Sequence, residues 1–284
     1  MNAQFFRKNT VALAIGLVGL VGLGATFYHL SNLEDLNGYF VPAAREMLRG
    51  GNPYDVPGFY GPPWALIPAL LLSWLPWRWA AAIHGPLTVV VLLVFCATLK
   101  VKPIRAIPMI LSVPVLGAVY MGNLDPFLLL AVVTPRPVGV ILLATKPQVG
   151  GFLILLWTIE AYRDGGLKAV IRLLSPTLAL SLSSIILYGF WPAVWFTSAQ
   201  TCAGWNHNMW NGWVHIPIIG VPLAALALWK RRNDLALGVG PFLSPYASVY
   251  AFTAWLPAMA TWPTWVAWVF GLATWALVLK QLIG

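Results

Sequence analysis

Long apolar segments separated by short polar ones dominate the chain. A helix that crosses a membrane needs about 20 mostly apolar residues. The apolar segments are 9–30, 63–76, 79–99, 104–120, 122–145, 148–162, 168–190, 213–229, 233–252 and 256–280. This pattern predicts an all-α, polytopic membrane protein with about ten spans, organised as one transmembrane domain over residues 1–284. Pro135 and Pro137 are expected to break the fifth segment into two halves.

Composition supports the membrane class. Hydrophobic residues make up 60% of the chain and charged residues 9%, against about 25% charged residues in soluble domains, and the mean hydropathy is +0.78. The net charge of +9 is spread over short loops, with no dense basic tract or motif typical of nucleic-acid binding. Membrane lipids with anionic head groups are therefore the expected partners of this charge, and no nucleic acid is expected.

Basic residues set the expected orientation. In a ten-span count, the groups at 7–8, 163–172 and 230–232 and Lys280 fall on one side, which the positive-inside rule makes cytoplasmic. Both termini are then cytoplasmic, the first run is a retained anchor in the cell membrane, and the loops 31–62 and 191–212 are external. Lys100, Lys102 and Arg105 come out external if 63–76 is a true span and cytoplasmic if it is re-entrant. The external assignment is preferred at this point.

Residues 31–62 form a polar island, and we use the name "island" for this segment. It holds four of the eight acidic residues, namely Glu34, Asp35, Glu46 and Asp55. Carboxylates beside a bilayer are costly to desolvate and are candidates for function. Within the island, residues 38–49 are predicted to form an interfacial helix with one apolar face, which consists of Phe40, Ala43, Ala44, Met47 and Leu48. Gly50-Gly51-Asn52-Pro53 should end this helix.

A series of short motifs begins at the island. Asp35 is followed by Tyr39, Ala43-Ala44-Arg45, Gly51-Asn52-Pro53-Tyr54 and Tyr60-Gly61-Pro62-Pro63, and later by Met121-Gly122-Asn123-Leu124, Thr145-Lys146-Pro147-Gln148 and Leu243-Ser244-Pro245-Tyr246. In this order the motifs resemble those of polyprenol-phosphate-dependent glycosyltransferases of the GT-C superfamily, in particular glycosyltransferase family 87. The resemblance implies transfer of a sugar, with inversion, from a polyprenyl-phosphate donor to an acceptor hydroxyl at the external face. The lipid-linked sugar is then a substrate, and no cofactor is implied.

The resemblance also implies roles for single residues. Asp35 matches the catalytic aspartate and would be the general base, with its neighbour Glu34 as the fallback; alternatively, Asp35 only caps the island helix. Lys146 would bind the donor phosphate, or else extend to the lipid head groups. Substrate-binding candidates beside Lys146 are Gln148, Arg45, Tyr39 and Tyr54.

The second polar loop offers a further set of candidates. Asn206, His207 and Asn208 alternate with tryptophans at 205, 210 and 213, a mixture of rings and amides suited to a sugar. Trp191 and Trp195 are expected to belong to the aromatic belt at the membrane interface. Asp125 is expected on the cytoplasmic side as a helix cap. The scattered histidines have no metal-ligand spacing, so no metal site is predicted.

Two other functions remain open from the sequence. A catalytically silent accessory or lipid-binding subunit of a larger membrane assembly, with a membrane protein as partner, is the main alternative to an enzyme. A transporter is disfavoured because charged residues in mid-span and paired broken helices are missing from the pattern.

Overall fold

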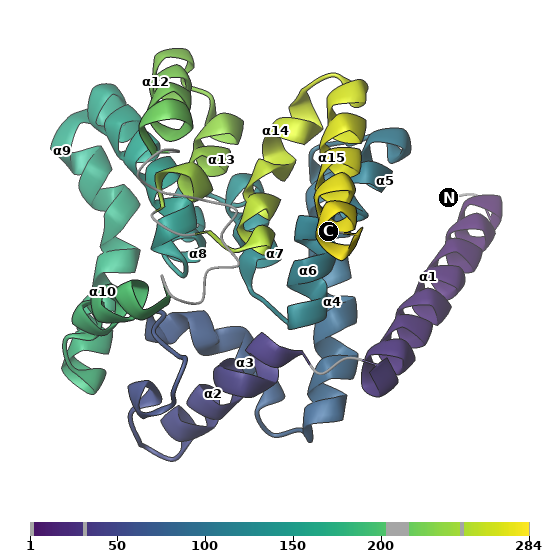
Figure 1. Cartoon of the computed structure of the whole chain (residues 1–284), viewed down its shortest axis with the longest axis horizontal. Coiled ribbons are helices and arrows are strands. Elements are labelled where there is room, and N and C mark those ends of the chain that lie inside the picture. Colours follow the sequence, from purple (N-terminus) through teal and green to yellow (C-terminus); the bar gives the residue numbers. More distant parts are fainter. Residues whose placement is uncertain (1–2, 31–32, 203–215, 245–246, 284) are drawn as a thin grey trace.

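The computed structural model describes residues 3–30, 33–202, 216–244 and 247–283 (Figure 1). Every regular element in these ranges is a helix, so the all-α prediction is confirmed. In chain order the elements are α1 (Ala3–Leu30), η1 (Leu36–Phe40), α2 (Val41–Leu48), η2 (Pro53–Asp55), η3 (Pro63–Leu66), α3 (Ile67–Leu72), α4 (Trp77–Thr98), α5 (Pro103–Ile110), α6 (Val113–Met121), α7 (Asp125–Leu128), η4 (Leu129–Val133), α8 (Arg136–Leu143), α9 (Pro147–Tyr188), α10 (Trp191–Cys202), η6 (Ile216–Gly220), α12 (Val221–Lys230), α13 (Asn233–Leu243), η7 (Val249–Trp255), α14 (Leu256–Thr261) and α15 (Thr264–Ile283).

Few stretches of the described ranges qualify as complete spans. Helices α4 and α9 are long and apolar enough to cross a membrane, and α5 with α6 would add a third span if this pair, bent by 56°, counts as one. The remaining apolar helical stretches of the described side chains are 10–17 residues long, namely Gly16–His29, Pro63–Leu72, Ile218–Lys230 and Thr264–Ala276, and about ten complete spans are not confirmed. Helix α9 is itself interrupted, because Gly165 and Gly166 leave helical geometry, and its ribbon bends sharply (Figure 1).

The island folds into a small platform with its own apolar core. Predicted helix 38–49 is observed as η1 followed by α2, and Ala43 and Ala44 of its apolar face are fully buried. Leu48 is an exception, since it is 49% exposed. The helix ends at Leu48, and Gly50 follows shortly after it with φ of +80°, as expected from the glycine pair. This core also takes in residues from α3 and from the start of α4.

Segment 63–76 is not a span, contrary to the preferred prediction. It contains only the short elements η3 and α3, and the turn that follows returns to α2. The guanidinium of Arg45 donates hydrogen bonds to the carbonyl oxygens of Ser73 (2.8 Å) and Leu75 (2.9 Å). Both ends of the segment therefore stay with the platform, because six residues of helix rise only about 9 Å.

Helix α4 begins at the platform and carries the chain to the opposite end of the molecule (Figure 1). Its 22 residues correspond to about 33 Å. Lys100, Lys102 and Arg105 follow it, so these cations lie at the end opposite the island, and the preferred assignment to the island side is wrong. Contacts place one more cation, Arg232, at this end. Arg105 donates to Thr264 at 3.4 Å, and Arg232 donates to the nearby Thr261 at 3.3 Å.

Segment 122–145 is a hairpin. The chain leaves the island side along α7 and η4, reverses at residues 134–135 and returns along α8. The predicted break at Pro135 and Pro137 is confirmed, with Pro137 in the first turn of α8. Near the reversal, Arg136 pairs with Glu160 of α9 at 2.6 Å. The two ends of this segment consequently lie close together beside the island, where they form the site described next.

Candidate functional site

The carboxylate of Asp35 is held where the chain enters the platform. Asp35 is half-buried at the start of η1, whereas the neighbouring Glu34 is exposed. Oδ2 of Asp35 accepts a hydrogen bond of 2.6 Å from Nδ2 of Asn123. The hydroxyls of Tyr39 and Tyr250 also form hydrogen bonds with it. Donors from three elements therefore orient this carboxylate.

Tyr39 lies one turn after Asp35. Burial of the phenol, and then the adjacent Asp35 carboxylate, raise the pKa of Tyr39 well above its ordinary value. Both causes disfavour the phenolate. Tyr39 consequently keeps its proton at any physiological pH and acts as a donor to Asp35.

Asn123 follows Gly122, whose left-handed backbone conformation only glycine adopts easily. Gly122 ends α6 with φ of +72°, and a Cβ on it would come within 2.7 Å of the Leu36 Cβ. The next residue, Asn123, is 3% exposed, and its Oδ1 accepts a hydrogen bond of 3.0 Å from the backbone N–H of Asp125. Glycine in the left-handed conformation thus lets this turn pack directly on the island.

Lys146 caps the start of α9 and completes the site. Its ammonium lies 2.6 Å from Oδ1 of Asp125 and 3.4 Å from Oδ1 of Asn123. It also lies 4.7 Å from the centre of the Tyr250 ring, which is cation–π distance. The Asp125 side chain is fully buried and that of Lys146 is 21% exposed, so the pair lies at the inner edge of the site.

The position of Asp125 corrects an expectation. Asp125 was expected on the side away from the island, as a helix cap. Because it pairs with Lys146, it lies on the same side as Lys146 and Asp35. The capping contact in this turn is made by the Asn123 side chain instead. The hairpin form of residues 122–145 explains the difference, since a segment that enters and returns leaves both of its ends together.

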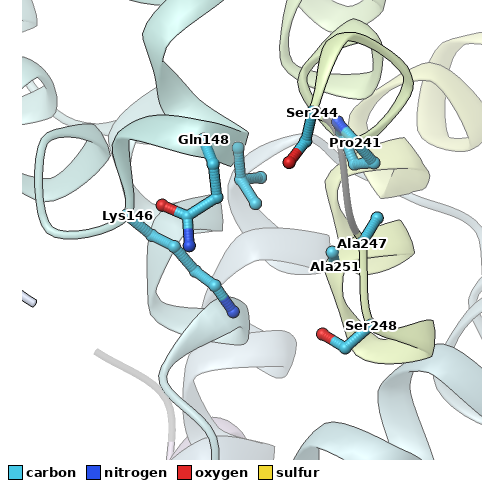
Figure 2. A pocket seen from close by; sticks show the side chains of 8 residues that line it. Lys146, Gln148, Pro241, Ser244, Ala247, Ser248 and Ala251 are labelled. Carbon is cyan, nitrogen blue, oxygen red and sulfur yellow. The ribbon is translucent and has the colours of Figure 1, made fainter. Parts of the chain in front are cut away.

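A small hollow opens beside Lys146. It contains about 210 Å³ of empty space, part of which is open to the surroundings. Figure 2 shows Lys146 and Gln148 on one side of it and Ser244 and Ser248 on the other. Oε1 of Gln148 is buried and has no hydrogen-bond partner among the described residues. Gln148 and Lys146 therefore line the same hollow, and the role of Gln148 in substrate binding stays a prediction.

Two predicted substrate-binding residues serve the platform itself. Arg45 lies on α2, and its guanidinium donates hydrogen bonds to carbonyl oxygens just after the end of α3. The hydroxyl of Tyr54 donates to the Gly61 carbonyl at 2.9 Å, and the Tyr54 ring stacks on Phe59. Neither contacts Asp35 or Lys146 in any interaction described here. Both residues hold the island together, and the fold does not bring them into contact with Asp35 or Lys146, so their assignment to substrate binding stays a prediction without support from this geometry.

The second polar loop contributes little that can be tested. Asn206, His207 and Asn208 lie outside the described residues, as do the tryptophans at 205, 210 and 213. Trp191 was expected in a lipid-facing belt, but it is 9% exposed and its ring packs edge-on against Trp64, with the centroids 5.6 Å apart. Trp191 thus belongs to the packing between α10 and the platform.

Sequence reasoning missed three contributors to this site: Asp125, Ser248 and Tyr250. Asp125 carried a signal, as an acidic residue in an apolar segment. The sequence gave no signal for Tyr250 or Ser248, because aromatic and small polar residues are common throughout the chain. Asn123 was noticed only as part of a motif. In the described ranges, no group of three or more His, Cys, Asp or Glu side chains comes together as a metal site would require.

Comparisons with models of protein families, with curated proteins and with solved structures find no match to this chain.

Proposed function

We propose that this protein is a membrane glycosyltransferase that moves a sugar from a polyprenyl-phosphate donor to an acceptor hydroxyl, with inversion, at the end of the molecule that carries the island. The observation that carries the proposal is that Asp35 and Lys146, 111 positions apart in the chain, both contact Asn123. A base and a cation next to one another are what an acceptor hydroxyl and a leaving phosphate require.

The proposed reaction is a single displacement. Asp35 takes the proton of the acceptor hydroxyl as its oxygen attacks the anomeric carbon of the sugar. The bond from that carbon to the phosphate oxygen breaks, and its electron pair stays on the phosphate. Lys146 stabilises the charge that develops there. Since an ammonium has three N–H donors, Lys146 can bind a phosphate oxygen while keeping Asp125 and Asn123.

The hollow beside Lys146 is the proposed phosphate subsite. The chemistry of its lining supports this assignment, because the Lys146 ammonium, the Gln148 amide and the Ser248 hydroxyl border the same hollow. All three groups can donate hydrogen bonds to phosphate oxygens. The sugar would extend from there toward Asp35, and the lipid chain would lie in the bilayer.

The charge distribution supports an orientation in the cell membrane with the island outside, as expected for the proposed GT-C type of enzyme. Lys100, Lys102, Arg105 and Arg232 are at the end opposite the island, as the positive-inside rule requires of a cytoplasmic face. In this arrangement 63–76 is part of the external platform and 122–145 is a hairpin, so the chain has fewer complete spans than the sequence predicts. Helix α15 begins beside Arg105, at the end proposed to be cytoplasmic, and its 20 residues lead away from that end. The expected cytoplasmic position of the C-terminus therefore has no support in this arrangement.

One observation favours a second candidate, a catalytically silent lipid-binding subunit. Lys146 is already neutralised by a fully buried carboxylate, so the pair could serve only to hold the hairpin on the platform. Such a protein would bind lipid-linked phosphate, or a membrane protein partner, without transferring sugar.

The test is transfer of labelled sugar from polyprenyl-phosphate donors by the purified protein. Asp35→Asn keeps the size and the hydrogen-bonding shape but removes the base, so transfer should fall by about 10²-fold or more. Glu34→Gln is the matched control, because Glu34 is the exposed neighbour, and it should retain activity. Equal activity in Asp35→Asn and the wild type would contradict the base assignment. No transfer by the wild type with any donor would favour the lipid-binding subunit.

A further inference from the structure

The Asn123 amide has a single orientation that satisfies its neighbours. Its Oδ1 accepts from the Asp125 N–H and faces the Lys146 ammonium, and both of these groups are donors only. The Nδ2 group is therefore the one that faces the carboxylate of Asp35, at 2.6 Å. The side chain is only 3% exposed, so it is largely shielded from bulk water.

We propose that Asn123 is a positioning residue that holds the carboxylate of Asp35 in a fixed place relative to the ammonium of Lys146. This proposal rests on the proposed function and deepens it. It says that one amide, that of Asn123, fixes the distance between the base and the phosphate-binding cation. A donated N–H also favours the charged form of a carboxylate. Misplacement of reacting groups by about 1 Å can cost a factor of about 10² in rate.

A purely structural role for Asn123 makes a different prediction. As a structural element, the side chain only accepts the Asp125 N–H within the turn, and aspartate accepts such a hydrogen bond as well as asparagine does. The capping contact of this turn should then survive in Asn123→Asp. As a positioning residue, however, the same variant replaces the donor to Asp35 with a second carboxylate, and like charges at this distance disfavour double ionisation.

The chain offers a matched control in Asn52. Its Oδ1 accepts from the backbone N–H two residues ahead, that of Tyr54, at 3.1 Å, as Asn123 does with Asp125. Asn52→Asp makes the same change of charge in the same kind of turn, without contact to Asp35. The titratable groups that face Asp35 or its partners are unchanged in both variants; they are Tyr39, Tyr60, Tyr250, Asp125 and Lys146.

The first measurement is the pH profile of kcat/KM for sugar transfer. In Asn123→Asp, transfer at neutral pH should fall about tenfold or more, and the acid limb should move to higher pH by about one unit or more, because the two carboxylates hold a shared proton. Asn52→Asp should keep the wild-type profile. An unchanged profile in Asn123→Asp would overturn the proposal.

A second measurement does not depend on activity. The chain has five aspartates, Asp35, Asp55, Asp125, Asp164 and Asp234, so carboxyl-labelled aspartate gives few NMR signals, and Asp35→Asn identifies that of Asp35. The titration midpoint of this signal should move to higher pH in Asn123→Asp and stay in place in Asn52→Asp. If the wild type transfers no sugar, the proposed function fails, and this titration alone tests whether Asn123 acts on Asp35. An unmoved midpoint overturns the role of Asn123, and a moved midpoint supports it.

Discussion

The ammonium of Lys146 lies 2.6 Å from the carboxylate of Asp125, so the two ends of an apolar segment long enough for a span meet at one place. This contact makes residues 122–145 a hairpin and brings Asp125, Asn123 and Lys146 to the island together. The site depends on this pair, because it holds the two ends of the hairpin together next to Asp35.

The Lys146–Asp125 pair should be worth much more to stability than a surface ion pair. Lys146→Met leaves a fully buried carboxylate without its cation, a change that typically costs about 3–5 kcal/mol. Adding Asp125→Asn removes the unpaired charge and should restore most of the lost stability. Thermal unfolding in detergent measures both effects. The double variant should nevertheless transfer no sugar, because the proposed phosphate ligand is missing; a single Lys146→Met variant as stable as wild type would contradict this role of the pair.

Gly122 should be intolerant of any side chain. Gly122→Ala places a Cβ in a left-handed turn, at a cost of about 1–2 kcal/mol, and within 2.7 Å of the Leu36 Cβ. The turn must then move away from the island and take Asn123 with it, so both stability and transfer should fall. Gly117→Ala in the same helix is the control: its Cβ meets only Val249, at 3.6 Å. Equal unfolding temperatures for the two variants would count against this packing.

Arg45 should matter for stability rather than for substrate binding. Arg45→Met removes two hydrogen bonds from a charged donor to the carbonyls of Ser73 and Leu75, for a loss of about 2 kcal/mol or more. Arg49→Met, on the same helix and with a side chain 75% exposed, should leave stability unchanged. If Arg45→Met instead raised KM for the donor without lowering stability, the original assignment of Arg45 to phosphate binding would be restored.

Lys102 should be inaccessible from the outside of intact cells. In a chain with Cys96 and Cys202 replaced by serine, Lys102→Cys should react with a membrane-impermeant thiol reagent only after permeabilisation. Asp55→Cys, at an exposed position of the island, should react in intact cells. Labelling of both positions in intact cells would show that the island and the 100–105 cluster share a side, against the arrangement in Figure 1.

The helical class, the island and its amphipathic helix could be read from the sequence, which also named Asp35 and Lys146 as candidates. Each depends on local features: apolar length, a helical period, or a charge in an apolar segment. The apolar face of α2 was predicted almost residue by residue, because helical periodicity alone selects Ala43 and Ala44. Leu48 was misassigned since it stands at the end of the helix, where no neighbour covers it.

Tertiary structure alone decided how the apolar segments are used and which residues share the site. Whether an apolar stretch crosses or turns back depends on contacts with distant parts of the chain, as between Arg45 and the end of α3 or between Lys146 and Asp125. Hydropathy registers length and polarity but no partners, so it counted 63–76 and 122–145 as single spans. For the same reason Asn123 and Tyr250 became recognisable as site residues only when the fold placed them against Asp35.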